Sequence, residues 1–189
     1  MTKETPITAA ASSVAEPAAA LRPADLQFLT AQRVARLATV DEAGGPHVLP
    51  VCFAVLGGWL YVPVDAKPKR GDPRQLARLR HLRKRPEAAF LCDEYQEDWT
   101  RLRWLLIRAR ARILEAGPER TAALAALERR YPQYAAMRLA ELDLPVIALD
   151  PTTIRRWTSS AAWRPHLRTH HRVSPLPPSW RGHIGTYVL

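Results

Sequence analysis

The 189-residue sequence has little cysteine: Cys52 and Cys92 are its only thiols, and they form no Cys-x-x-Cys pair. Each lies in an apolar segment, which is more typical of a small buried side chain than of a metal ligand or a disulfide. No apolar run is long enough to span a bilayer, and no apolar core follows a basic region near the N-terminus. We therefore expect a soluble, cytoplasmic protein with no membrane partner.

Motifs that indicate side-chain catalysis are also missing. The sequence contains no Gly-x-Ser-x-Gly, no His-Glu-x-x-His, no Walker loop and no Gly-x-Gly-x-x-Gly. Three histidines, His166, His170 and His171, lie among prolines without a neighbouring carboxylate or thiol. Fortuitous metal affinity is the better interpretation of that cluster, and we expect no metal site.

Positive charge is what the sequence has in excess, with 28 Lys and Arg against 18 Asp and Glu and a net charge of +10. Such an excess favours anionic partners: nucleic acid, an acidic membrane surface or a phosphorylated cofactor. The arginines are spread along the chain instead of forming one basic block, which weakens the nucleic-acid interpretation.

Composition divides the chain into three parts. Residues 1–21 are rich in Ala, Thr, Ser and Pro without an apolar period, which predicts a disordered leader. Residues 159–189 are rich in Pro, His and Arg, which predicts an irregular tail. Residues 22–158 carry the periodic apolar patterns of a single domain of ordinary size.

Within that domain the patterns predict a β-rich α+β fold. Leu102, Trp104 and Leu106 alternate with arginines, so we expect these three on a buried face and the arginines on a polar face or an interface. Antiparallel hairpins dominate, which favours a small six-stranded barrel with helices flanking its openings. We expect strands at 35–41, 48–56, 59–65, 88–95, 99–115, 145–149 and 154–157, and helices beginning near Pro23 and spanning 73–85 and 117–142.

The stretch 44–70 is the strongest candidate site. Two apolar strands meet at Gly57-Gly58, a dipeptide typical of a tight hairpin turn, and Lys67, Lys69 and Arg70 follow directly. Arg74 and Arg78 are four residues apart, so a helix would bring them to one face. Five converging cations would hold a phosphate or polycarboxylate, whereas the ordinary alternative is a solvated charged face.

Two other residues have both an ordinary and a functional interpretation. His47 begins a strand and Asp65 ends one, so each is first a strand-end residue and second a ligand contact.

Several segments together resemble the split β-barrel superfamily of pyridoxamine 5′-phosphate oxidase-like flavin and deazaflavin proteins, above all its branch of probable coenzyme F-420-dependent enzymes. The resemblance covers about residues 24–158. Its segments are ARLATV (35–40), GPHVLPVCF (45–53), VDAKPK (64–69), LRHLRKRP (79–86), 89–95 with Asp98-Trp99, and 102–114.

The resemblance implies the FMN-binding type of split barrel, in which a homodimer holds the cofactor in a groove at its interface. It implies hydride transfer between F-420, or FMN as the alternative, and a small conjugated substrate, with the cofactor and no side chain carrying the hydride. Arg70-Gly-Asp-Pro-Arg lengthens the loop after Lys69, which leaves open which cation meets the phosphate. Carried over, the cofactor contacts are Pro50, Val51, Cys52, Val64 and Asp65 along the ring, Lys67, Lys69, Arg70, Arg74 and Arg78 at the phosphate, Trp99 or Trp104 from the partner subunit, and His47 on the substrate side.

Two rival hypotheses remain. The same barrel could bind a flavin or deazaflavin without turnover, or it could be the scaffold of a basic protein associated with nucleic acid. Cations interleaved with stacking aromatics would support the second rival, but most tryptophans lie in expected core or strand positions.

Overall fold

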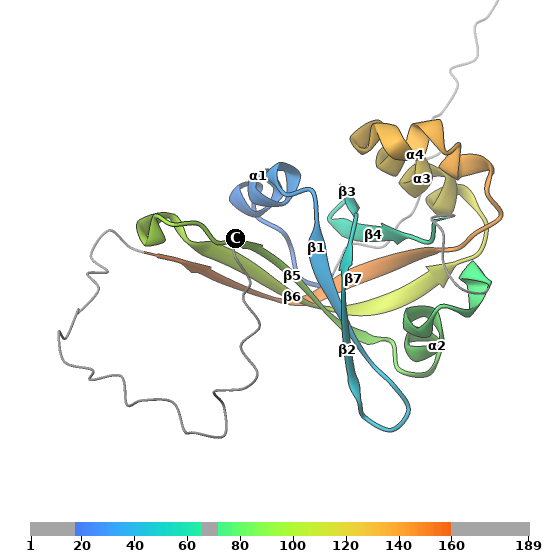
Figure 1. Ribbon diagram of the computed structural model, residues 1–189, viewed down its shortest axis with the longest axis horizontal. Helices are drawn as coiled ribbons and strands as arrows, with labels where there is room; N and C mark the ends of the chain where they lie inside the picture. The colour runs from blue at the N-terminus through green and yellow to red at the C-terminus, as the bar shows by residue number, and fades with distance from the viewer. Residues whose placement is uncertain (1–17, 66–71, 160–189) are drawn as a thin grey trace, which may run out of the picture. The chain divides into compact units, whose positions relative to one another are not determined.

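The structure, a computed structural model, describes residues 18–65 and 72–159 (Figure 1). Predictions made for residues 1–17, 66–71 and 160–189 lie outside the described residues. Of the predicted leader, only residues 18–21 are described, and the Ala19 N–H donates to the Pro151 carbonyl at 2.7 Å.

One antiparallel sheet in the strand order β2-β1-β5-β6-β7-β4-β3 forms the centre of the fold. This confirms the sheet-rich α+β class. The strands are β1 (Ala35–Val40), β2 (Pro46–Val51), β3 (Ala54–Leu56), β4 (Trp59–Pro63), β5 (Glu87–Glu94), β6 (Arg103–Leu114) and β7 (Val146–Thr158).

The two ends of this sheet are joined by a very short piece of chain. β2 and β3 are the outermost strands, yet only Cys52 and Phe53 separate them. Three Cα–Cα steps span at most about 11 Å, so the sheet must curl until its ends lie beside one another. The predicted continuous strand 48–56 is therefore wrong: the segment changes partners, from β1 to β4, at Cys52-Phe53. Within the described residues the sheet therefore has seven strands, where a six-stranded barrel was predicted.

The predicted hairpin turn at Gly57-Gly58 is confirmed. Gly57 has φ +60° and Gly58 has φ +84°, and the turn joins β3 to β4. Positive φ at both central positions is the geometry of a type I′ turn, which glycine adopts without steric cost.

Proline breaks the helix that was expected over 117–142. Its residues form α3 (Pro118–Arg130), α4 (Pro132–Ala136) and the 3-10 turn η3 (Leu139–Glu141). Tyr131 is extended, at φ −127° and ψ 104°, because the residue before a proline is excluded from the helical region. The N-terminal helix begins at Pro23 as predicted and forms α1 (Pro23–Ala31).

The helix expected over 73–85 is also divided. A 3-10 turn, η1 (Pro73–Gln75), is capped by Asp72, whose carboxylate accepts the Arg74 N–H at 2.8 Å. Leu76 is not helical, at φ −56° and ψ 137°, and α2 (Ala77–Lys84) begins after it.

The prediction for the buried face of the strand expected over 99–115 is wrong. β6 buries Leu105, Ile107, Ala109 and Ala111, whereas Trp104 and Leu106 share the opposite face with the exposed Arg108, Arg110 and Arg112. The strand begins at Arg103, after the 3-10 turn η2 (Trp99–Arg101), so the pattern read from residue 99 placed the alternation one residue out of step. We call the buried side the inner face and the side bearing Trp104 and Leu106 the outer face.

The last two predicted strands are a single strand, β7. Its pairing with β6 is irregular at Arg108/Ala109, where Thr152 is the extra residue and Pro151 pairs with Ala109. A proline is tolerated inside a sheet at such a bulge, because the ladder hydrogen bond it cannot donate is already interrupted there.

Two apolar clusters hold the fold together. The first fills the barrel and includes Leu37, Phe90, Ile107 and Leu149, all fully buried. The second lies where α3 and α4 cover the β3–β4 hairpin (Figure 1). No helix within residues 18–65 and 72–159 is long and apolar enough to cross a membrane.

Candidate functional site

The crossover, Cys52-Phe53, is fixed by a tyrosine from the end of α3. The Tyr131 hydroxyl accepts the Phe53 N–H at 3.0 Å. Its own hydrogen can go to the Phe53 carbonyl or the Arg33 carbonyl, each 2.9 Å away. Because Tyr131 is only 4 % exposed, these bonds are shielded from water. The backbone at the crossover is thus held rigidly, as a binding wall must be.

Buried charge lies beside the end of β4. Asp65 is 6 % exposed and accepts a hydrogen bond from the Tyr134 hydroxyl at 3.2 Å. Arg78 from α2 is 9 % exposed and its Nη2 donates to the Pro63 carbonyl at 3.5 Å. Its Nε is buried and has no hydrogen-bond partner among the described residues.

Arg78 therefore has a donor to spare. Burial lowers the pKa of its guanidinium, and the Asp65 carboxylate opposes that shift. An arginine normally stays charged in proteins, and a buried unpaired N–H is costly. An anion beside Nε would supply the missing acceptor with a charge-assisted hydrogen bond.

Tyr134 connects this charge to the crossover. Burial raises the pKa of its hydroxyl, and the neighbouring Cys52 and Asp65 raise it further, so Tyr134 remains a protonated donor. Cys52 lies within hydrogen-bonding reach of the same hydroxyl. Since Pro50 precedes Cys52 by two residues, a ligand lying along 50–52 would run for about 7 Å from the outer face toward Asp65 and Arg78.

The outer face carries a cavity of about 420 Å³, which we call the hollow. It spans three neighbouring strands, because Arg36 pairs with Leu91, and Leu91 pairs with Leu106. Pro50 is paired with Arg36 from the other side. The hollow is lined by Arg36, Leu91, Asp93, Tyr95, Trp104 and Leu106.

Aromatic rings and one ion pair give the hollow its chemistry. Trp104 stacks on Trp157 of β7, with ring centroids 6.4 Å apart and an interplanar angle of 17°. Tyr95 is 67 % exposed. Arg36 Nη1 donates to Asp93 Oδ1 at 2.6 Å. A concave, mostly apolar cavity with a few polar groups is typical of a small-molecule site.

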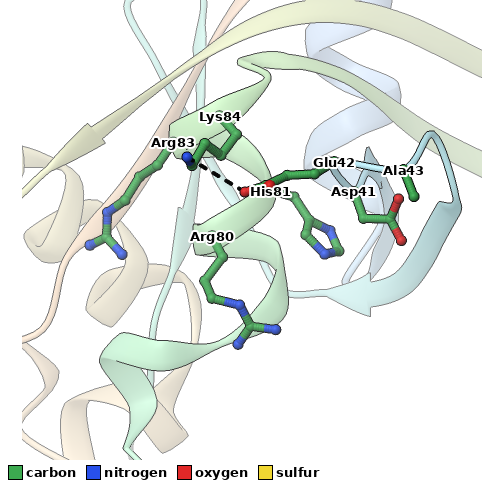
Figure 2. A pocket seen from close by; sticks show the side chains of 7 residues that line it. All are labelled: Asp41, Glu42, Ala43, Arg80, His81, Arg83 and Lys84. Atoms are coloured by element: carbon green, nitrogen blue, oxygen red, sulfur yellow. Dashed lines mark ion pairs between the residues drawn. The ribbon is translucent and has the colours of Figure 1, made fainter.

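A second cavity, of about 510 Å³, lies between the β1–β2 turn and α2 (Figure 2). Lys84 Nζ lies 3.6 Å from Glu42 Oε1, and Arg80 donates to the Gln75 carbonyl. Behind it, His81 Nδ1 is 3.0 Å from Thr39 Oγ1. Its walls are Asp41, Glu42, Ala43, Arg80, His81, Arg83 and Lys84.

His47 lies next to this second cavity instead of next to the hollow. It pairs with Thr39 across the β1–β2 ladder, and its ring meets the His81 ring edge-on with centroids 5.3 Å apart. Its Nδ1 is buried without a hydrogen-bond partner among the described residues.

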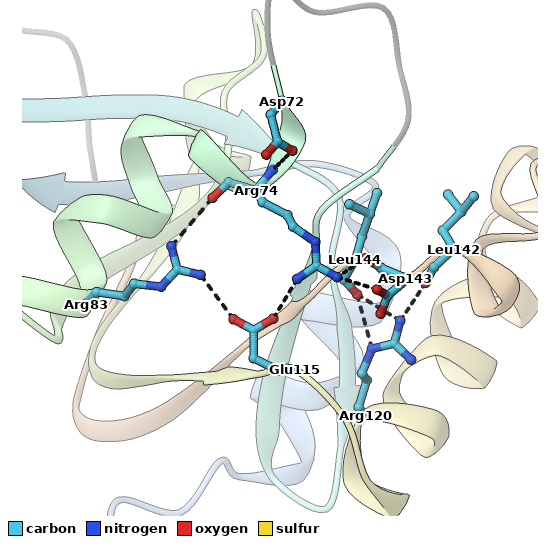
Figure 3. Close-up of polar contacts among 8 residues, drawn as sticks. All are labelled: Asp72, Arg74, Arg83, Glu115, Arg120, Leu142, Asp143 and Leu144. Atoms are coloured by element: carbon cyan, nitrogen blue, oxygen red, sulfur yellow. Dashed lines mark hydrogen bonds and ion pairs between the residues drawn. The ribbon is translucent and has the colours of Figure 1, made fainter.

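Arg74 and Arg78 do not share a face, because Leu76 interrupts the helix between them. Figure 3 shows Arg74 directed toward two carboxylates: Nη1 is 3.2 Å from Glu115 Oε2 and Nη2 is 2.7 Å from Asp143 Oδ2. Glu115 also binds Arg83 at 3.0 Å. Arg74 would have to give up these partners to hold a phosphate.

The remaining predicted contacts are distributed as follows. Pro50 is exposed on the outer face beside Arg36, at the edge of the hollow, and Trp104 lines the hollow two strands beyond Arg36. Val51 and Val64, at 6 % and 1 % exposed, pack in the barrel core and do not offer their side chains to a ligand. Trp99 is 54 % exposed. Lys67, Lys69 and Arg70 lie outside the described residues.

Sequence reasoning missed Arg36, Leu91 and Tyr134. Arg36 is the one charge inside the apolar strand ARLATV, and that position was a usable signal of an outward-facing side chain. Tyr134 acts across 69 residues of sequence, and no local pattern reports such a contact. Residues 18–65 and 72–159 contain no group of three or more metal-ligating side chains placed to hold a metal ion.

Comparison with known proteins identifies a family for most of the chain. The sequence profile described as "Pyridoxamine 5'-phosphate oxidase" matches residues 21–158. No curated protein matches the chain.

Solved structures share the fold at low sequence identity, which supports the fold alone. A conserved hypothetical protein from Mycobacterium tuberculosis is 18 % identical, with 85 % of this chain and 98 % of that chain covered and a TM-score of 0.61. HutZ, the heme storage protein from Vibrio cholerae, is 20 % identical, with 75 % of this chain and 98 % of that chain covered and a TM-score of 0.59. A heme binding protein from Mycobacterium smegmatis is 20 % identical, with 75 % of this chain and 57 % of that chain covered and a TM-score of 0.58.

Proposed function

Because the chain belongs to the pyridoxamine 5′-phosphate oxidase family, we propose that it is a homodimeric oxidoreductase that binds F-420, with FMN as the alternative cofactor. When bound, the cofactor would exchange a hydride with a small conjugated substrate, and the protein would position the two and balance charge. The observation that carries this proposal is the buried Arg78, whose Nε has no acceptor among the described residues.

Arg78 fits the anionic group that both cofactors carry. A phosphate oxygen at Nε would complete the hydrogen bonding of a guanidinium that is only 9 % exposed. The neighbouring Asp65 carboxylate accepts a hydrogen bond from Tyr134. Because Asp65 is held in this way, it would leave the Arg78 guanidinium oriented toward the ligand. Lys67, Lys69 and Arg70 are proposed to add charge at the same group.

The cofactor ring is proposed to lie along Pro50, Val51 and Cys52. This segment runs from the edge of the hollow to the thiol beside Tyr134. A cofactor bound in this way would have its phosphate near Arg78. The reactive part of its ring would be directed toward the hollow, where a second flat molecule has room.

The homodimer is supported by the outer face. Val48, Trp157 and Tyr95 are 61 %, 39 % and 67 % exposed, and together with the half-buried Leu91, Trp104 and Leu106 they put large apolar side chains on this face. A second copy of the chain would cover it and enclose the hollow.

Heme is the second candidate ligand, since two of the structural relatives are named for it. Tyr95 is the specific observation in its favour: tyrosine can ligate heme iron, and the described lining of the hollow holds no histidine, cysteine or methionine.

The test is a titration of cofactor-free protein with F-420, FMN and hemin, followed by quenching of tryptophan fluorescence. We expect F-420 to bind with a dissociation constant in the micromolar range or below. Arg78→Met should weaken it by about tenfold or more, which is the effect of losing one charge-assisted hydrogen bond. Arg78→Lys keeps the positive charge and serves as a second variant in case Arg78→Met fails to fold. The matched control is Arg110→Met, which removes an exposed arginine of β6.

Each alternative outcome has a definite meaning. Tight FMN binding with weak F-420 binding would change the cofactor and keep the class. Hemin binding that Tyr95→Phe abolishes would replace the oxidoreductase with a heme protein. If none of the three ligands binds, the proposal is wrong.

A further inference from the structure

We infer that the hollow is the substrate subsite of the proposed oxidoreductase, and that it selects a planar conjugated compound carrying a carboxylate. The ring would stack on Trp104 and the carboxylate would pair with Arg36. That the bound compound is a substrate rests on the proposed function. The binding chemistry itself rests on the residues of the hollow alone.

The walls of the hollow favour a flat ring. Leu91 and Leu106 are cross-strand neighbours and form an apolar floor. Trp104 is held in place from behind by Trp157, so one of its faces is fixed by the stack before any ligand arrives. Aromatic rings prefer offset stacking with centroids a few ångströms apart, and a preordered ring loses little entropy on binding.

The charges around the hollow favour an anion. Arg36 is paired with Asp93, but its side chain is 46 % exposed. Arg108 pairs with Ala89, and Arg155 pairs with Leu106, so both also project from the outer face. Neither makes an ion pair within the described residues. Three arginines against one aspartate leave a positive surface around an apolar floor.

The Arg36–Asp93 pair makes the selection specific. Exposed ion pairs are weak, so a ligand carboxylate can exchange with Asp93 at small cost. A bidentate carboxylate is the group that a guanidinium fits best. A neutral ring would gain the stacking but not the ion pair, so the charge decides between otherwise similar compounds.

The experiment compares two probes of the same shape, 9-anthracenecarboxylate and 9-anthracenemethanol, by fluorescence anisotropy on the cofactor-free protein at low salt. We expect the carboxylate to bind about tenfold more tightly than the alcohol. Arg36→Gln should bring the two probes to equal affinity, and Trp104→Leu should weaken both. Asp93→Asn should tighten the carboxylate severalfold, because it removes the competing anion, and leave the alcohol unchanged.

The control is Arg110→Gln. Arg110 of β6 belongs to another exposed arginine–carboxylate pair with β5, 3.5 Å from Glu87, and does not line the hollow. Equal binding of the two probes to wild type, or an Arg36→Gln effect no larger than that of Arg110→Gln, would overturn the inference. Because no cofactor is present, its failure is distinct from that of the proposed function, which is decided by the F-420, FMN and hemin titrations.

Discussion

The inner and outer faces of the sheet are built from alternate residues of the same strands, and they differ in almost every respect. On the inner face Phe90 and Ile107 are fully buried, and Phe90 meets Phe53 edge-on with centroids 5.0 Å apart. On the outer face the next residues, Leu91 and Leu106, are only half-buried and line the hollow.

The difference separates stability from function. The inner face is closed by the curl of the sheet and by α1 and α2, so its side chains are buried. Over β3, β4 and the start of β7 the outer face is covered by α3 and α4. Over β1, β5 and β6 it carries large aromatic and apolar side chains that remain partly exposed in the described chain, and such patches mark binding surfaces. Neighbouring residues on opposite faces should therefore respond differently to the same substitution.

The largest difference is expected for Phe90→Ala against Leu91→Ala. Phe90→Ala removes a fully buried ring and leaves a cavity, which should lower the free energy of unfolding by about 3–5 kcal/mol. Leu91→Ala should cost about 1 kcal/mol and weaken ligand binding in the hollow. Urea unfolding followed by circular dichroism measures both. Equal losses would mean that the outer face is as much a part of the core as the inner one.

A smaller difference is expected for Arg156→Gln against Arg155→Gln. Arg156 binds the buried Asp25 of α1 through two bonds of 2.6 and 2.7 Å, whereas Arg155 is exposed on the outer face. Arg156→Gln should lower the free energy of unfolding by about 2 kcal/mol at pH 7. Arg155→Gln should change it by no more than about 0.5 kcal/mol.

The Asp25–Arg156 pair also predicts a pH dependence. Burial alone would raise the pKa of Asp25, but the hydrogen bonds from Arg156 and Arg22 outweigh it and hold that pKa below its ordinary value of 3.8. A lowered folded-state pKa stabilises the fold above the unfolded value, and the contribution disappears as the pH falls through the folded one. The cost of Arg156→Gln, measured by urea unfolding, should therefore shrink from pH 7 to the region below pH 3.8. A cost that is the same at both pH values would contradict the pairing.

Local chemistry accounts for the parts of the fold that the sequence predicted. Gly57-Gly58 dictates its turn through positive φ, Ala35–Val40 is a strand by composition, and Pro118 begins a helix. Pro132 is an equally visible helix breaker, although a single helix was predicted across it.

The predictions that were wrong concern features that depend on contacts between distant parts of the chain. Nothing between Val48 and Leu56 marks Cys52-Phe53 as the point of partner exchange, because both strands read as one apolar run. The face of Trp104 depends on where β6 begins, and a shift of one residue reverses every side chain. The candidate site was half predicted for the same reason: Pro50, Trp104 and Arg78 stand near it, whereas the Arg36–Asp93 pair joins strands 57 residues apart.

The most direct measurement of the contrast between the two faces is the mass of the protein in solution, by sedimentation equilibrium. If the outer face is built to be covered, wild type should sediment at about twice its chain mass of 21.3 kDa. Leu106→Glu, which places a charge on that face, should sediment at the mass of one chain. Ala122→Glu, an equal change at an exposed position of α3, should remain a dimer. A monomeric wild type, or a dimer that tolerates Leu106→Glu as well as Ala122→Glu, would contradict the account.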